Sequence, residues 1–134
     1  MLWVEVDDLR YTQRSISAFF RRDGRAQRPR RRIANLASAI ADSRVSTDAE
    51  FLKLRVMQIG AALYSLDNRR LWCLKRAQVI KRRRTNVYVG TLHVNTMLVG
   101  VLESNIVARV FRNHYDTRTH GRSITVRTSP RRPR

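Results

Sequence analysis

The segment from residue 52 to residue 84 constrains the fold most, because it specifies strands and a helix in a fixed order. Two strand-like runs, Leu52–Gln58 and Ala61–Ser65, flank Gly60, and this arrangement predicts a hairpin turn. Asp67 then offers an N-cap for a helix that ends in the basic run Lys81–Arg84. The apolar face of this helix is expected at Leu71, Trp72, Leu74 and Ile80.

The sequence on either side adds strands and a second helix. Alternation of apolar and polar residues over 2–6 predicts a half-buried opening strand. Apolar residues at the i, i+3, i+4, i+7 spacing over 33–40 predict an amphipathic helix. Further strands are expected at 85–94, 105–112 and 123–127.

Residues 95–104 fit either a short helix capped by Asn95 or another strand. With this order of elements we expect a small α+β domain over residues 1–127, in which two main helices accompany a mixed sheet. Basic extensions are expected as a loop at 21–32, where Asp23-Gly24 indicates a turn, and as a tail at 128–134.

Charge limits the partners of this domain. The chain has 28 Lys and Arg against 10 Asp and Glu, a formal net charge of +18, and Arg dominates over Lys. Such a charge repels itself in a compact state, and the planar fork of Arg suits bidentate contacts to phosphate. We expect a nucleic acid as partner rather than a membrane, because no strongly amphipathic basic helix and no run of ~20 apolar residues is present.

The cations concentrate in three runs, Arg21–Arg32, Lys75–Arg84 and Arg131–Arg134. Because these runs are separated in the sequence, they can engage several phosphate strands at once, as in folded RNA. The candidate nucleic-acid-binding residues are Arg21, Arg22, Arg25, Arg28, Arg30, Arg31, Arg32, Arg69, Arg70, Lys75, Arg76, Lys81, Arg82, Arg83, Arg84, Arg131, Arg132 and Arg134.

Arg69 and Arg70 stand at the expected start of a helix, where the partial positive charge of the unpaired N–H groups disfavours cations. We expect Asp67 to cap the helix and to neutralise both arginines in part, which leaves their outer donors for an external phosphate. The alternative is that both arginines pair with Asp7, Asp8 or Glu50 inside the fold.

Few residues fit catalysis or metal binding. Cys73 is the single cysteine, and the adjacent pair Asp7-Asp8 would point to opposite faces of a strand. His114, Asp116 and His120 form a weak metal or nuclease pattern, which fits a polar loop better. No phosphate-cradling glycine-rich loop and no nucleophile elbow is present. We expect no enzymatic activity, cofactor or metal.

The central motifs resemble the ParB/sulfiredoxin-like superfamily. "ANLASAI" is similar to its first helix, "LYSLDNRRLWCLKRAQ" to the segment from second strand to second helix, and "NIVARVF" to the strand that closes the fold. The phrase from Tyr64 to Lys75 is closest to a ParB-like subgroup in which Tyr-Ser-Leu-Asp-Asn-Arg-Arg-Leu recurs. The resemblance implies CTP binding, nuclease activity or a catalytic cysteine in different members.

Carried over by residue, Arg69 and Arg70 match the two arginines of the nucleotide motif, whereas Asp67 replaces its glycine and Asn68 its acid. A carboxylate at Asp67 would repel a phosphate at the helix start, which counts against nucleotide binding. The sulfiredoxin cysteine would align with Asn68, so that nucleophile is absent.

These observations predict a non-enzymatic, RNA-binding structural component of a large ribonucleoprotein, with a mitochondrial ribosome as the specific expectation and a cytoplasmic ribonucleoprotein as the alternative location. Its partners would be rRNA and neighbouring proteins, without a small-molecule substrate or a membrane. The alternative function is a DNA-binding ParB-like protein with nuclease or CTP-dependent switching activity. A third possibility is a structural subunit whose charge meets an acidic protein.

Overall fold

A computed structural model describes residues 2–20, 31–85, 90–102 and 121–127 of the chain. In chain order its elements are β1 (Leu2–Glu5), the 3₁₀ turn η1 (Val6–Asp8), β2 (Leu9–Tyr11), β3 (Ser15–Ser17), α1 (Ile33–Ala41), the 3₁₀ turn η2 (Glu50–Leu52), β4 (Leu54–Ile59), β5 (Ala62–Ser65), α2 (Asn68–Thr85), β6 (His93–Leu102) and β7 (Thr125–Arg127). The expected α+β class, with two main helices and a mixed sheet, is confirmed for this part of the chain.

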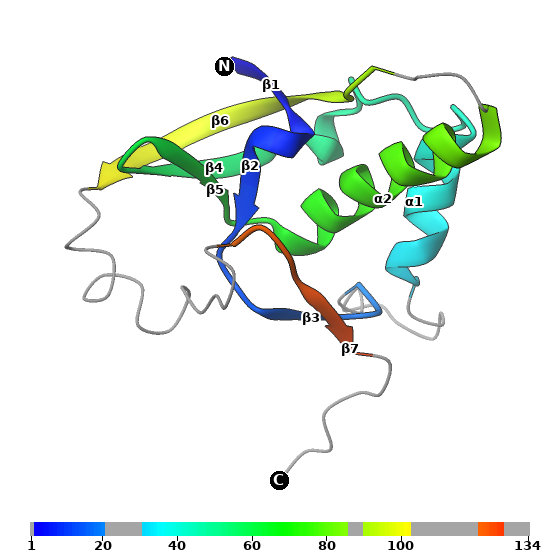
Figure 1. Ribbon diagram of the computed structural model, residues 1–134, viewed down its shortest axis with the longest axis horizontal. Coiled ribbons are helices and arrows are strands. Elements are labelled where there is room, and N and C mark those ends of the chain that lie inside the picture. The colour runs from blue at the N-terminus through cyan, green and yellow to red at the C-terminus, as the bar shows by residue number, and fades with distance from the viewer. Residues whose placement is uncertain (1, 21–30, 86–89, 103–120, 128–134) are drawn as a thin grey trace, which may run out of the picture.

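The main sheet has five strands in the order β1-β6-β4-β5-β2 (Figure 1). β1 pairs with β6 and β4 pairs with β5 in the antiparallel sense, whereas β4 with β6 and β2 with β5 are parallel. A separate two-stranded sheet joins β3 to β7. Because β2 and β5 are parallel, their carboxyl ends meet at one place, and α2 begins there directly after β5.

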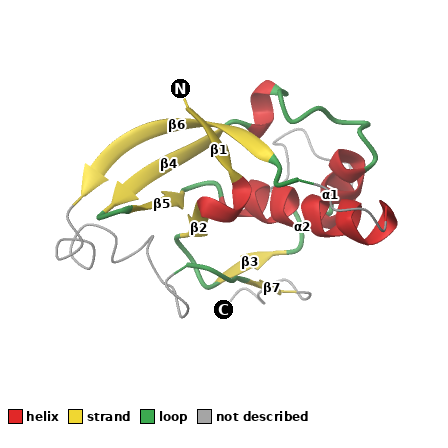
Figure 2. Cartoon of the chain, turned by 45° about the horizontal axis from the view of Figure 1, so that its top comes forward, coloured by secondary structure: helices red, strands yellow, loops and turns green. Residues whose placement is uncertain are grey.

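The two helices pack against each other beside the main sheet (Figure 2). Their contact buries the apolar faces that the sequence pattern predicts for α1, with Ile33, Ala37 and Ile40 in the core. On α2 the predicted Leu71 and Leu74 are buried, whereas Trp72 and Ile80 are only half-buried. Cys73 and Ala77 complete the buried face of α2.

The predicted hairpin is confirmed between β4 and β5. Ala62 pairs with Ile59, so the turn consists of Gly60 and Ala61, and Gly60 adopts a positive φ of 60°, which glycine tolerates best. β4 begins at Leu54 rather than at Leu52, because Leu52 ends the η2 turn and is buried there. The last strand is likewise shorter than predicted and covers Thr125–Arg127.

Two stretches differ from the simple strand patterns. The opening strand ends at Glu5, since Val6 enters the η1 turn and its N–H donates to the carbonyl of Leu92. Residues 95–102 are strand, because β6 pairs with β4 over residues 96–102 and with β1 over residues 93–96. The strand predicted at 85–94 is wrong for most of its described residues: Thr85 ends α2, 90–92 precede β6, and only His93 and Val94 are strand. Residues 86–89 and the strand predicted at 105–112 lie outside the described residues.

Candidate nucleic-acid interface

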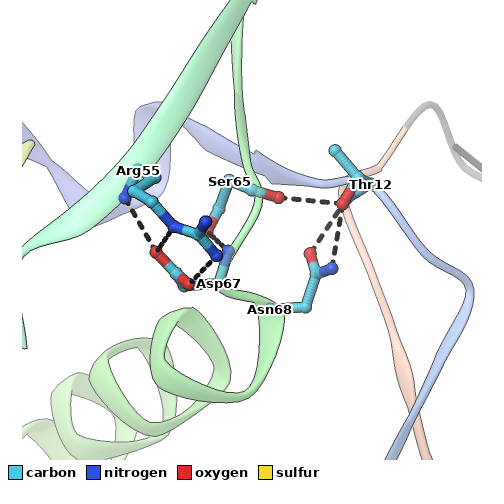
Figure 3. Close-up of polar contacts among 5 residues, drawn as sticks. All are labelled: Thr12, Arg55, Ser65, Asp67 and Asn68. Atoms are coloured by element: carbon cyan, nitrogen blue, oxygen red, sulfur yellow. Dashed lines mark hydrogen bonds and ion pairs between the residues drawn. The ribbon is translucent and has the colours of Figure 1, made fainter. Parts of the chain in front are cut away.

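The start of α2 is fixed to the carboxyl ends of β2 and β5 by a buried polar network (Figure 3). The Thr12 N–H donates to Asn68 Oδ1 at 3.0 Å, and Asn68 Nδ2 donates to Thr12 Oγ1 at 2.9 Å. Thr12 Oγ1 in turn donates to the carbonyl of Ser65 at 2.9 Å. This network positions the first turn of α2, and with it Arg69 and Arg70.

Asp67 has a different role from the predicted one. Its carboxylate accepts from the backbone N–H of Arg55 at 2.8 Å and from Arg55 Nη2 at 2.9 Å, so it binds strand β4 (Figure 3). The hydrogen bond raises the pKa of the Arg55 guanidinium further above its ordinary value. The Asp67 carboxylate, which we expected to neutralise Arg69 and Arg70 in part, forms hydrogen bonds and an ion pair with Arg55.

Arg69 turns toward the segment that precedes α1. Its Nη1 donates to the carbonyl of Phe19 at 3.0 Å. The guanidinium of Arg32 lies over the ring of the same Phe19, 5.6 Å from the centroid, and Arg32 bridges Phe19 in a short antiparallel contact. The fold therefore brings Arg32 and Arg69, two predicted site residues that are 37 positions apart in the sequence, to the same phenylalanine.

Along α2, Arg69, Arg76 and Arg83 follow one another at intervals of seven residues. Seven residues are nearly two helical turns, so these three arginines share one face and span about 21 Å along the axis. Arg76 and Arg83 are exposed, and neither forms a hydrogen bond or ion pair with any residue that the structure describes. We call Arg32, Arg69, Arg76 and Arg83 the basic row.

Other predicted cations of α2 are used inside the fold. Arg82 pairs with Asp7 at 3.9 Å, and Arg84 is bonded to Asp42. Lys75 lies over the Tyr11 ring, 5.1 Å from its centroid, and burial lowers the pKa of its ammonium. These contacts make the three cations weaker candidates for phosphate binding than Arg76 and Arg83.

The alternative was that Arg69 and Arg70 pair with Asp7, Asp8 or Glu50, and two of these three carboxylates have other partners in the structure. Asp7 accepts from Gln78 Nε2 at 2.9 Å and pairs with Arg82, and Glu50 pairs with Lys53. Arg70 is half-buried and has no hydrogen bond or ion pair within the described residues.

The remaining predicted site residues divide into two groups. Arg31 is exposed next to Arg32, and its carbonyl accepts from the N–H of Phe20; Lys81 is half-buried on α2. Those outside the described residues are Arg21, Arg22, Arg25, Arg28, Arg30, Arg131, Arg132 and Arg134. The weak metal pattern His114, Asp116 and His120 also lies outside them.

Sequence reasoning missed Phe19, the residue on which Arg32 and Arg69 converge. The available signal was an aromatic pair, Phe19-Phe20, directly before a basic run. It also missed Arg10, whose guanidinium lies 5.9 Å from the centroid of the Tyr64 ring. Arg10 stands alone in the sequence, so no cluster pointed to it.

Within the described ranges, no three His, Cys, Asp or Glu side chains gather closely enough to hold a metal ion. None of the helices described there has the length and apolar character needed to cross a membrane. Comparison with protein-family models, with curated proteins and with solved structures finds no match to the chain.

Proposed function

We propose that the chain is a non-enzymatic RNA-binding protein that contacts the phosphate backbone through the basic row. The observation that carries this proposal is the pair Arg76 and Arg83, which are exposed on one face of α2 without a carboxylate partner in the described part of the chain. Arg32 and Arg69 extend this face toward Phe19. A polyanion supplies the negative charge that a chain of net charge +18 lacks.

The site favours the phosphate backbone over base edges. Arginine forks bind phosphate oxygens regardless of sequence, and contacts of this kind fix the orientation of a protein on a nucleic acid. Trp72 is half-buried against the core beside the basic row, which leaves it less available for stacking on bases. RNA shape, rather than RNA sequence, is therefore the expected determinant of binding.

The test compares two double variants that remove the same charge from the same helix. Arg76→Gln with Arg83→Gln removes two arginines that have no partner among the described residues, whereas Arg82→Gln with Arg84→Gln removes arginines that pair with Asp7 and Asp42. Binding of a structured RNA is followed by fluorescence anisotropy over a series of salt concentrations. We expect the first variant to lower the slope of log K against log salt by roughly 1.5 to 2, and the second to lower it much less.

Equal effects of the two double variants would contradict a contact through the basic row, because they would show a general response to net charge. A wild-type chain without measurable RNA affinity at physiological salt would overturn the function itself.

We further propose a large ribonucleoprotein as the setting, with a mitochondrial ribosome as the leading candidate and a cytoplasmic particle as the alternative. Arginine-rich runs that are separated in the sequence support this setting, because they suit a protein held between RNA strands. Co-sedimentation of the protein with a large particle should be lost after ribonuclease treatment. Sedimentation that ignores ribonuclease would count against it and favour an acidic protein partner.

A second candidate is a ParB-like DNA-binding protein that switches with CTP or cuts DNA. It is favoured by Arg70, which the resemblance aligns with the nucleotide motif and which has no partner among the described residues. Against it, Asp67 and Asn68 fill the helix start with side chains already bonded to Arg55 and Thr12. CTP binding by calorimetry that Arg70→Ala abolishes would favour this candidate.

A further inference from the structure

The far half of β6 is an edge without a neighbouring strand on one side in the described part of the chain. β1 pairs with β6 only from His93 to Thr96, whereas β6 continues to Leu102 (Figure 1). β4 covers the other side of this half as far as Leu102. A strand edge of this kind presents backbone N–H and C=O groups that can pair with another strand.

This edge is apolar and uncharged. Of the exposed large apolar side chains, four belong to it, with exposed fractions of 43% for Met97, 43% for Leu98, 45% for Val99 and 62% for Val101. Residues 93–102 contain no Lys, Arg, Asp, Glu or Pro, in a chain of which 28% is charged. Charged residues and proline are the usual protection of an edge strand, and β6 has neither.

The charge distribution separates this edge from the proposed RNA surface. Phosphate contacts need cations, so the uncharged run of β6 offers an RNA strand little. An acidic protein would be drawn to α2, where Arg76 and Arg83 are exposed, rather than to β6. What the β6 edge fits is a strand that is itself apolar and uncharged.

We propose that a second copy of the chain pairs with this edge, antiparallel, through residues 98–102 of both copies around a twofold axis near Gly100. A twofold contact uses one patch twice, so Leu98, Val99 and Val101 of each copy would meet the same apolar run of the other. Two chains of net charge +18 repel each other, and this strand lets them approach without bringing its own charged side chains together. The pairing would join the two five-stranded sheets into one over about 17 Å of strand.

The inference concerns the chain alone and does not depend on RNA binding. Its test uses the full chain, freed of nucleic acid by nuclease and kept at about 0.5 M salt, where repulsion between the copies is screened. Sedimentation equilibrium over a range of micromolar concentrations should give a dimer for the wild type. Val101→Lys should weaken the dimer by more than about tenfold, because it forces an ammonium group to lose its hydration in an apolar contact, a cost that salt does not remove.

Phe51→Lys is the matched control. Phe51 is exposed to a similar extent, 49%, and its replacement by Lys adds the same charge, but Phe51 lies in the η2 turn. This variant should dimerise like the wild type. Hydrogen exchange of the wild type provides a second readout, since those amides of residues 98–102 that point away from β4 should become more protected as the protein concentration rises.

A wild type that stays monomeric at all concentrations would overturn the proposal, and so would a dimer that Val101→Lys leaves intact. Concentration-independent protection of the amides that point away from β4 would also overturn it, because the cover would then come from the same chain. If Val101→Lys does not fold, the concentration dependence of exchange in the wild type decides alone.

Discussion

The buried network at the start of α2 makes a quantitative prediction for Asn68→Ala. Asn68 and Thr12 are 7% and 2% exposed, so water cannot replace the lost amide. The Thr12 N–H would lose its acceptor, at a cost of about 1–3 kcal/mol for an unsatisfied buried donor. Loss of the bond from Nδ2 to Thr12 Oγ1 adds about 0.5–1.5 kcal/mol, and the better helix propensity of Ala returns less than about 0.7 kcal/mol.

These contributions sum to a loss of about 1–4 kcal/mol in the free energy of unfolding, with a central value of about 2.5 kcal/mol. Urea unfolding followed by tryptophan fluorescence should show this as a midpoint lower by roughly 1 M or more at an unchanged slope. Asn35→Ala is the control, because Asn35 is exposed on α1, and its effect should stay within about 0.5 kcal/mol.

A double-mutant cycle with Thr12→Val isolates the network from other effects of the substitution. Thr12 and Asn68 share two hydrogen bonds, so their effects should not add, with a coupling of about 1 kcal/mol or more. An effect of Asn68→Ala no larger than that of Asn35→Ala, or effects that add without coupling, would refute the argument that this network anchors the helix.

Three further predictions concern single contacts. Burial raises the pKa of the Cys73 thiol to about 12, so a thiol reagent at pH 8 should label Cys73 only after unfolding, and rapid labelling of the folded chain would contradict this. The Arg84 guanidinium holds the pKa of the Asp42 carboxyl below its ordinary value, so this pair stabilises the fold above about pH 4 and the stabilisation is lost as the pH falls further. The difference in free energy of unfolding between wild type and Asp42→Asn, measured by denaturation at each pH, should therefore vanish in acid. A Cβ on Gly100 would lie 2.9 Å from Met57 Sδ, near the movable end of a flexible side chain, so Gly100→Ala should change the free energy of unfolding by less than about 1 kcal/mol, and a larger loss in thermal unfolding would contradict this.

Local patterns predicted those elements whose structure depends on neighbouring residues. The periodicity over 33–40 and the run after Asp67 yield α1 and α2, and Gly60 marks the hairpin. The ambiguity at residues 95–102 was genuine, because an apolar run of this length fits a helix or a buried strand equally well. Pairing with β1 and β4 decided it, and neither partner is close in the sequence.

The candidate site was less predictable because its contacts join distant residues. Asp67 looked like a helix cap, yet its carboxylate binds Arg55, twelve positions earlier on a neighbouring strand. Arg69 reaches Phe19 over a separation of 50 residues. Composition identified the cations, but only the fold separates those with internal partners, such as Arg84, from those without one in the described chain, such as Arg76.

The topology of the main sheet has a consequence for how the chain is made. Its two outermost strands, β1 and β2, are synthesised first, but β2 pairs with residues 63–65 and β1 with residues 93–96. Thr96 Oγ1 donates to the carbonyl of Leu2 across 94 positions. During synthesis β1 therefore has no strand to pair with until β6 has left the exit tunnel. Closing such long loops costs entropy before any contact compensates for it, which slows folding. A chain interrupted before residue 93 would leave β4 open on the side that β6 normally occupies.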